Sequence, residues 1–257
     1  MPFIPLSEAA KNSWIKDICL VAADMDGTLT QQGKFTASLL QALENLANAG
    51  IEVLIVTGRS AGWVSGLAAY LPIRGAIAEN GGLFYPGTGE VGASLTSLAE
   101  PVVHHQKLAQ MFRQLQAQFP HIKESSDNQF RVTDWTFDNQ DLSLIEIQQM
   151  ATLCAQQGWG FTYSAIQCHI KPPQQNKGAG LLTTLSTIES LQYHSEQILT
   201  VGDSPNDQDL FNPEVFPHSV GVANALAYRA EMTYRPAYVT AAAEGAGFCE
   251  LVSYLLS

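Results

Sequence analysis

Two aspartates separated by one residue, Asp24 and Asp26, directly follow the apolar run at residues 18–23. Such a run is typical of a strand that is buried on both faces of a parallel sheet. Ligand sites in open α/β sheets lie at the carboxyl ends of the strands. A pair of carboxylates held there can bind a hard cation and attack or deprotonate a substrate. Because Asp-x-Asp is equally typical of surface turns, a functional interpretation needs partners elsewhere in the chain.

Other polar residues lie where strands are predicted to end. Thr57 follows the apolar run at residues 51–56, and Asp203 follows another at residues 198–201, while Lys177 begins a predicted helix. The carboxyl ends of parallel strands with right-handed crossovers meet at one edge of the sheet. We therefore expect one cleft that contains Asp24, Asp26, Thr57, Lys177, Asp203, Asn206 and Asp207.

Each of these residues also has an ordinary structural alternative. Thr57 could cap the helix that follows it, and Lys177 could be a solvated residue at a helix start, although the helix dipole disfavours a cation there. Asp203 and Asp207 could be loop-forming residues, and Arg59 could either contact a substrate or cover a helix. The spacing alone leaves these alternatives open.

The elements that must position these residues follow from the apolar pattern. In the two outer parts of the chain, predicted strands alternate with predicted helices, as in a parallel α/β sheet. The expected strands cover residues 18–23, 51–56, 76–78, 198–201, 220–222 and 238–240, and the expected helices cover 36–49, 61–70, 177–188 and 248–256.

The buried runs disappear in the middle of the chain, which indicates a second kind of unit. Two helices, at 108–119 and 142–157, and half-exposed strands at 130–137, 159–163 and 166–171 are expected there. We therefore predict a discontinuous, Rossmann-like α/β core at residues 1–84 and 173–257. An α+β domain is predicted to be inserted at residues 85–172.

Some residues of the insertion could contact a substrate. Arg131, Trp135, His169 and Lys171 fall on its predicted strands, but half-exposed strands carry such residues without any ligand. Asn80 lies at the expected hinge between core and insertion, and the Gly-Gly turn that follows it is sufficient to explain an asparagine there without a functional role. The histidines show no metal-ligand spacing, and we expect them on the surface or in loops: His104, His105, His121, His169, His194 and His218.

Composition restricts the possible partners. The chain has 257 residues, 46% of them hydrophobic, and 13 Lys plus Arg against 24 Asp plus Glu give a formal net charge of −11. Nonspecific nucleic-acid binding draws its affinity from basic residues, so we expect no such partner. We also expect no membrane partner, because no apolar run approaches the length of about 20 residues that spans a bilayer. No secretory signal is visible and the four cysteines are scattered, which favours a cytoplasmic protein with reduced thiols.

Taken together, the motifs resemble the haloacid dehalogenase-like (HAD) superfamily of phosphohydrolases. Four motifs match in order: Asp24-x-Asp26-Gly27-Thr28, Thr57-Gly58, Lys177, and Gly202-Asp203-x-x-Asn206-Asp207. The place of the insertion, between the second and third motifs, and its α+β pattern are similar to the type IIB cap of the Cof-like subfamily. The closing stretch, residues 222–225, 239–240 and 244–247, is also similar to that subfamily.

The resemblance implies a Mg²⁺-dependent mechanism. Asp24 would be the nucleophile that forms an aspartyl-phosphate, and Asp26 would act as general acid and then general base. Mg²⁺ would be held by the carboxylates of Asp24 and Asp203 and by the backbone carbonyl of Asp26. Asp207 belongs to the same metal-binding set, with Asn206 beside it steadying water or phosphate. Thr57, the amide of Gly58, Lys177 and Asn206 would bind the phosphoryl oxygens.

Three functions are compatible with this set of residues. We expect a phosphatase that acts on a small phosphorylated metabolite, with a sugar phosphate as the favoured class. A phosphomutase of the phosphomannomutase type is the alternative, but it must grip two phosphates, and the cationic residues of the insertion are few and dispersed. A phospho-accepting signalling domain of the receiver kind also combines acidic residues, a hydroxyl and a lysine, yet it is about half as long and lacks an insertion.

Overall fold

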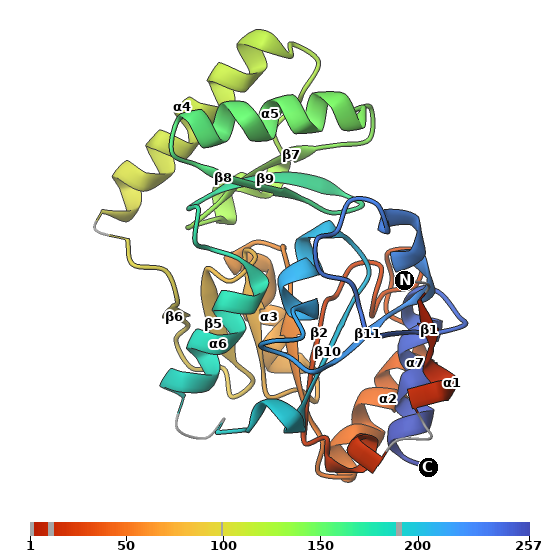
Figure 1. Ribbon diagram of the computed structural model, residues 1–257. Helices are drawn as coiled ribbons and strands as arrows, with labels where there is room; N and C mark the ends of the chain where they lie inside the picture. Colours follow the sequence, from red (N-terminus) through yellow and green to blue (C-terminus); the bar gives the residue numbers. More distant parts are fainter. Residues whose placement is uncertain (1–2, 10–12, 99, 189–191) are drawn as a thin grey trace.

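The computed structural model describes residues 3–9, 13–98, 100–188 and 192–257, which form a large and a small sheet with helices packed on them (Figure 1). The nine strands described in the large sheet are parallel except for the last two, which run antiparallel to their neighbours. In order across the sheet, they are β1 (Ile4–Pro5), β12 (Tyr238–Val239), β11 (His218–Gly221), β10 (Ile198–Gly202), β2 (Leu20–Ala23), β3 (Glu52–Val56), β4 (Gly75–Ala78), β5 (Leu83–Pro86) and β6 (Ala93–Ser94).

The register of the central strands aligns their carboxyl ends. Ala23 of β2 pairs with Val201 of β10 on one side and with Ile55 of β3 on the other. The residues that follow, Asp24 after β2 and Asp203 after β10, therefore leave the sheet at the same edge. This alignment is what the predicted cleft requires.

Apolar residues on both faces hold the large sheet between helices. Val21 and Ala23 belong to one apolar core, while Leu20 and Ala22 belong to the other, because alternate strand residues point to opposite faces. The first core packs against α2 (Ala37–Asn48), α3 (Ala61–Tyr70) and α7 (Glu244–Leu255), and the second against α6 (Lys177–Thr187) and the 3₁₀ helix η5 (Pro205–Phe211). The short helix α1 (Leu6–Ala9) buries Leu6 in the first core.

A second layered structure, here called the small unit, covers the elements from α4 to β9. Its antiparallel sheet has the order β7 (Trp135–Asp138), β9 (Gln167–Lys171), β8 (Gly160–Tyr163), and two helices, α4 (Pro101–Gln118) and α5 (Leu144–Gln156), pack on it. Figure 1 shows these helices on the side of the small sheet that points away from the large sheet. The small sheet thus lies between its helices and the large sheet.

Several boundaries differ from those expected: α4 and α7 begin earlier, at Pro101 and Glu244, and two further differences bear on the junction between the large sheet and the small unit. The predicted start of the insertion, residue 85, falls inside β5, and β5 and β6 extend the large sheet, so the chain leaves that sheet after Ser94. The strand predicted at 130–137 is wrong in its first half: η2 (Ser126–Phe130) ends there and β7 begins only at Trp135. The segment between them forms no ladder because the backbone N–H groups of Val132 and Thr133 donate to Glu79 instead.

Glu79 links the large sheet to the small unit. Its side chain is fully buried and accepts hydrogen bonds from the N–H groups of Ala61, Val132 and Thr133 and from the Thr133 hydroxyl. Burial raises the pKa of Glu79 to about 7, the nearby Asp134 adds to this, and Arg131 opposes it.

None of the described helices combines the length and apolar character that crossing a bilayer requires.

Replacing Glu79 by Gln tests this link. The amide places an NH₂ group against N–H donors, so we expect a loss of about 1–3 kcal/mol in the free energy of unfolding. The raised pKa of Glu79 also sets the direction in which the free energy of unfolding changes with pH. The protonated carboxyl contributes stability below about pH 4.5, and this contribution is lost as pH rises through about 7. The wild type should lose up to about 3 kcal/mol between pH 5 and pH 8 that the variant does not lose. Urea unfolding of both proteins at the two pH values measures this difference, and identical pH dependence would contradict the prediction.

Candidate active site

Three of the predicted carboxylates lie together at the carboxyl edge of the large sheet. Asp24 follows β2, Asp203 follows β10, and Asp207 lies in η5. All three are buried, and one carboxylate oxygen from each lies within 4.8 Å of the others. The structure therefore brings together residues that are up to 183 positions apart in the sequence.

Backbone and side-chain donors fix the two carboxylates that follow β10. Asp207 Oδ2 accepts from the N–H groups of Asp203 (3.0 Å) and Ser204 (3.1 Å), so the aspartate stabilises the loop that carries it. Asp203 accepts from the Thr28 hydroxyl at 3.3 Å and from the Asn224 amide at 2.6 Å. These bonds leave the two carboxylates little freedom to rotate.

Gly27 is required for this arrangement. Its φ of +85° is in the left-handed region, and a Cβ there would lie 2.6 Å from Asp203 Oδ2. Any side chain at this position would therefore displace the Asp203 carboxylate.

Lys177 lies among the carboxylates. It begins α6 directly after Asn176, whose side chain caps the helix by accepting from Ala179 N. The Lys177 ammonium is fully buried and donates to Asp24 and, at 2.7 Å, to Asp207. It is therefore not the solvated residue that its helix-start position could also have produced.

Burial and mutual repulsion dominate the electrostatics of this cluster. Burial raises the pKa of Asp24 to about 7 and Lys177 opposes that effect, while burial and the neighbouring Asp24 raise the pKa of Asp203 well above its usual value. For Lys177, burial lowers the pKa, but Asp207 and Asp24 outweigh it and the net shift is upward. Three carboxylates against one ammonium leave an excess of negative charge in a buried, all-oxygen site. This is the donor set that a hard divalent cation such as Mg²⁺ prefers.

Asp26 has a different partner. Its carboxylate forms a two-pronged ion pair with Arg59, with distances of 2.8 Å from Nε and 2.7 Å from Nη2, and it is not part of the three-carboxylate group. The Arg59 guanidinium also lies over the Trp63 ring, 5.3 Å from its centroid. Arg59 therefore covers the Trp63 side chain of α3 and also pairs with a predicted site residue, while its contact with a substrate stays a prediction.

The remaining predicted residues also lie at this edge. Thr57 is buried, and its hydroxyl accepts from Arg59 N at 3.1 Å; Ser60 occupies the N-cap position of the helix that follows, without a side-chain capping bond, so Thr57 is not the N-cap. Asn206 donates from Nδ2 to Asn80 Oδ1 at 3.1 Å. Thr57 and Asn206 thus keep their places beside the carboxylates through local hydrogen bonds.

A cavity of about 20 Å³ lies between the large sheet and the small unit. Six of its lining residues come from the large-sheet side and four from the small unit: Asp24, Asp26, Thr57, Gly58, Arg59 and Asn206, and Ser164, Ile166, Gln167 and His169. A larger cavity of about 600 Å³ lies along α4 but contains none of the predicted site residues. We therefore assign the chemistry to the small cavity, which has room for about one water molecule.

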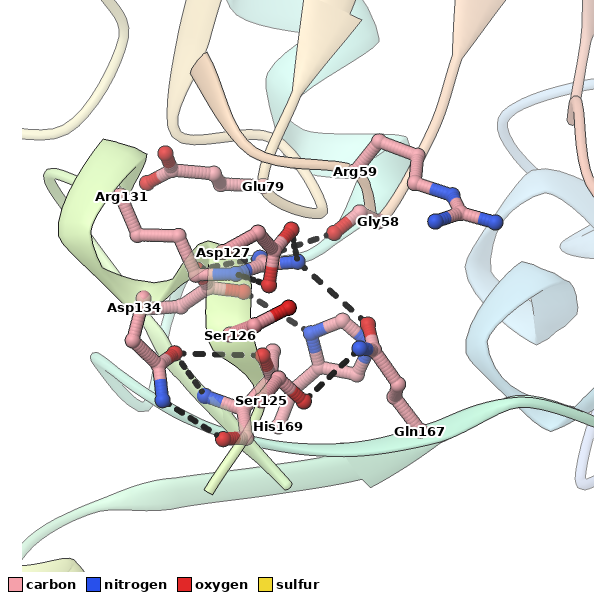
Figure 2. A network of polar contacts seen from close by, with 12 residues as sticks. Gly58, Arg59, Glu79, Ser125, Ser126, Asp127, Arg131, Asp134, Gln167 and His169 are labelled. Carbon is pink, nitrogen blue, oxygen red and sulfur yellow. Dashed lines mark hydrogen bonds and ion pairs between the residues drawn. The ribbon is translucent and has the colours of Figure 1, made fainter. Parts of the chain in front are cut away.

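The sequence analysis named Arg131 and His169 as possible substrate contacts of the insertion, but it missed the buried polar network that joins them beside this cavity (Figure 2). Arg131 pairs with Asp127 and Asp134 and donates to the carbonyl of Gly58 at 2.9 Å. His169 pairs with Asp134 and is 2% exposed, so its expected place on the surface or in a loop is wrong. In the sequence, the one sign of this buried network is the presence of charged residues inside a predicted strand.

Comparisons with known proteins agree with this geometry. The family model described as haloacid dehalogenase-like hydrolase matches residues 21–105. A phosphoglycolate phosphatase of Metallosphaera sedula is 28% identical over 245 residues, covering 93% of this chain and 100% of the relative.

Solved structures show the same fold. A protein of Thermoplasma acidophilum superposes with a TM-score of 0.72 at 21% identity, covering 93% of this chain and 98% of that one. The C-terminal domain of Candida albicans trehalose-6-phosphate phosphatase gives a TM-score of 0.73 at 15% identity, with 99% and 98% covered.

Fold and site together define a hydrolase with a parallel α/β core and an additional antiparallel cap. The matching family model, the relatives and the fold agree in supporting a phosphatase of the haloacid dehalogenase-like superfamily and of the Cof-like type, with the small unit in the position of a cap. The resemblance read from the motifs and the expected α/β fold class are thereby confirmed.

The close contact at Gly58 generates a prediction. A Cβ at Gly58 would lie 3.0 Å from His169 Cε1 and 3.2 Å from Asn80 Nδ2, both held by buried partners. We expect Gly58→Ala to lower the free energy of unfolding by about 1–2 kcal/mol through overpacking. It should also slow p-nitrophenyl phosphate hydrolysis, since the cavity residues must shift.

Gly66→Ala in α3 is the matched control. A Cβ there meets no heavy atom within 4 Å, and Ala favours the helix, so stability should rise by up to about 1 kcal/mol with activity unchanged. Urea unfolding and initial rates measure both effects. Wild-type stability and activity in Gly58→Ala would show that the contact is not tight in solution.

Proposed function

We propose that this phosphatase is a Mg²⁺-dependent phosphomonoester hydrolase that acts through an aspartyl-phosphate on a small phosphorylated metabolite. The observation that carries the proposal is the buried group of Asp24, Asp203 and Asp207 with Lys177 among them, directly beside the cavity. A carboxylate can approach a phosphate dianion only where positive charge offsets their repulsion. Lys177 supplies one such charge, and the excess of carboxylates provides the binding site for another.

Mg²⁺ fits the donor set of this site. The carboxylates of Asp24 and Asp203 would hold it, together with the backbone carbonyl of Asp26, and Asp207 lies close enough to bind it directly or through water. When bound, the ion neutralises charge on the phosphoryl oxygens and on the attacking carboxylate.

The chain's own residues account for the bond-making steps. Asp24 attacks phosphorus and forms the acyl phosphate, while the bond from phosphorus to the ester oxygen breaks. Asp26 gives its proton to the leaving alkoxide, and it then takes a proton from the water that attacks phosphorus and releases Asp24 and inorganic phosphate. The Arg59 ion pair holds the Asp26 carboxylate ionised at the edge of the cavity, which suits the base step; the acid step requires Asp26 to exchange a bond with Arg59 for a proton.

The phosphoryl group itself is bound by neutral and cationic donors. Thr57, the amide of Gly58, Lys177 and Asn206 surround the position beside Asp24, and three of them line the cavity. Charge spreads over the non-bridging oxygens in the transition state, where such donors stabilise it most.

The arrangement of cations favours hydrolysis over mutase chemistry. A mutase must hold a second phosphate, yet no Lys or Arg among the described residues of the small unit lines the cavity. Arg131 is fully engaged by Asp127, Asp134 and Gly58, and Lys171 donates to the carbonyl of Gln175. Water can therefore act as the acceptor without competition from a bound second phosphate.

Two substrate classes follow from different arguments. The relatives at 28% identity are phosphoglycolate phosphatases, which makes 2-phosphoglycolate one candidate. The motif resemblance favours a sugar phosphate. A screen of a few dozen phosphorylated metabolites with Mg²⁺ would distinguish the two classes.

The first mechanistic test is Asp24→Asn. This change removes the attacking charge but keeps the side-chain shape, so we expect hydrolysis to fall at least about a thousandfold with the fold intact. Asp141→Asn, an exposed position in the small unit, is the control and should keep wild-type activity. Initial rates with p-nitrophenyl phosphate and circular dichroism measure the two effects; an Asp24→Asn enzyme with a tenth of wild-type activity would rule out Asp24 as the nucleophile.

Metal removal is the second test. EDTA should abolish hydrolysis and Mg²⁺ should restore it, whereas Ca²⁺ should inhibit because it prefers longer bonds and more ligands. Mg²⁺ should also raise the Tm of the wild type, since it binds only the folded state, but not that of Asp203→Asn. Full activity in excess chelator, or the same Mg²⁺-induced change in Tm in both proteins, would refute the metal site.

A further inference from the structure

His169 is a residue of the small unit that packs against the phosphoryl-binding segment at Gly58. It lies in the middle of β9, is 2% exposed, and lines the small cavity. Its Cε1 and Nε2 atoms lie 3.0 Å and 3.2 Å from the place where a Cβ at Gly58 would be. The imidazole therefore covers the Gly58 backbone directly.

The orientation of this ring is fixed by a chain of buried contacts (Figure 2). His169 Nδ1 lies 2.9 Å from Asp134 Oδ2, and the other Asp134 oxygen accepts from Arg131 Nη1 at 2.8 Å. The same Arg131 nitrogen donates to the carbonyl of Gly58. These contacts lead from Gly58 through Arg131 and Asp134 to His169, which covers Gly58. They hold the imidazole in the orientation in which Nε2 lies at the cavity.

The partners of the ring decide what Nε2 offers. Asp134 is an ionised acceptor: burial raises its pKa, but Arg131 and His169 outweigh burial and the net shift is downward. The hydrogen therefore lies on His169 Nδ1. Burial lowers the pKa of His169, Arg131 and Lys177 lower it further, and Asp134 opposes them, so the ring is neutral and Nε2 presents a lone pair. No described residue donates a hydrogen bond to it.

A second unused polar atom lies beside the same segment. Asn80 is 1% exposed, its Oδ1 accepts from Asn206, and its Nδ2 has no hydrogen-bond partner among the described residues. This Nδ2 lies 3.2 Å from the same point over Gly58. A buried donor without a partner costs stability, which is consistent with a site that a ligand completes.

Resting on the proposed function, we propose that His169 is a specificity-determining residue whose Nε2 accepts a hydrogen bond from a hydroxyl on the leaving group. Arg131 and Asp134 act as positioning residues for that acceptor. A hydroxyl can donate a hydrogen bond to Nε2. Asn80 Nδ2 lies over the same segment but outside the cavity lining, so it is a neighbour of this acceptor and not a second partner of the hydroxyl. A carboxylate has only acceptors and would meet the lone pair of Nε2. The site thus favours a phosphorylated polyol or sugar over 2-phosphoglycolate.

Two variants separate the hydrogen bond from the packing. In His169→Asn, the amide nitrogen can still donate to Asp134, so the buried pair stays satisfied, but nothing occupies the place of Nε2. His169→Gln places an amide oxygen farther out, where it can replace the acceptor. His105→Asn is the matched control, because His105 is bonded to Asn128 and does not line the cavity.

KM and kcat are measured for glycerol 1-phosphate, 2-phosphoglycolate and p-nitrophenyl phosphate, with circular dichroism to check folding. We expect His169→Asn to raise KM for glycerol 1-phosphate about tenfold, the loss of roughly one hydrogen bond, with kcat little changed. KM for p-nitrophenyl phosphate should change less than about twofold, since that ester has no hydroxyl to bind. His169→Gln should recover part of the loss, and His105→Asn should behave as wild type.

Several outcomes would overturn the inference. One is an unchanged KM for glycerol 1-phosphate in folded His169→Asn, and another is an equal rise in KM for all three esters. A third is a wild-type preference for 2-phosphoglycolate over glycerol 1-phosphate. By contrast, a wild type that hydrolyses none of the three esters in Mg²⁺ refutes the proposed function itself. If His169→Asn does not fold, His169→Gln decides. This variant should keep part of the wild-type preference for glycerol 1-phosphate. Complete loss of that preference in folded His169→Gln contradicts the acceptor role.

Discussion

The buried ion pairing of Lys177 with Asp24 and Asp207 is the interaction on which the rest of this structure depends. Removing charges from water is expensive, and only close opposite charges and complete hydrogen bonding offset that cost. The register of β2 with β10 brings Asp24 into range, and η5 turns Asp207 back toward the sheet. Carboxylates outnumber the ammonium in this cluster, and the Mg²⁺ of the proposed function would offset that excess of negative charge.

This cluster could be predicted from the sequence because the residues next to each polar side chain are sufficient to identify the strand that carries it. An unbroken apolar run before Asp24, a second before Thr57 and a third before Asp203 each identify a buried parallel strand and its carboxyl end. Parallel topology then places those ends at one edge without any knowledge of side-chain contacts. The role of Lys177 was harder to predict, since a lysine at a helix start is also typical of a solvated residue. Only its agreement with the other motifs favoured a place in the site.

The parts that sequence reasoning missed all depend on partners distant in the chain. Glu79 satisfies backbone groups of Val132 and Thr133, which is why the expected strand at 130–137 begins late. Asp134 and His169 are buried together, yet neither carries a local sign of burial, because charged residues in a short strand are usually exposed. The expected boundary at residue 85 falls inside β5 for a related reason: β5 has only four residues and the edge strand β6 only two, so neither forms the long apolar run that marks a central strand.

The hydrogen bond from Arg131 to the carbonyl of Gly58 has a thermodynamic consequence. The peptide segment whose amide is proposed to bind phosphate also offers its carbonyl to the small unit, so the two contacts share one piece of backbone. Whatever orders Gly58 from one side lowers the entropy left to lose from the other. On the proposed function, phosphate binding and the contact with the small unit would be reciprocally linked, each strengthening the other by the same factor.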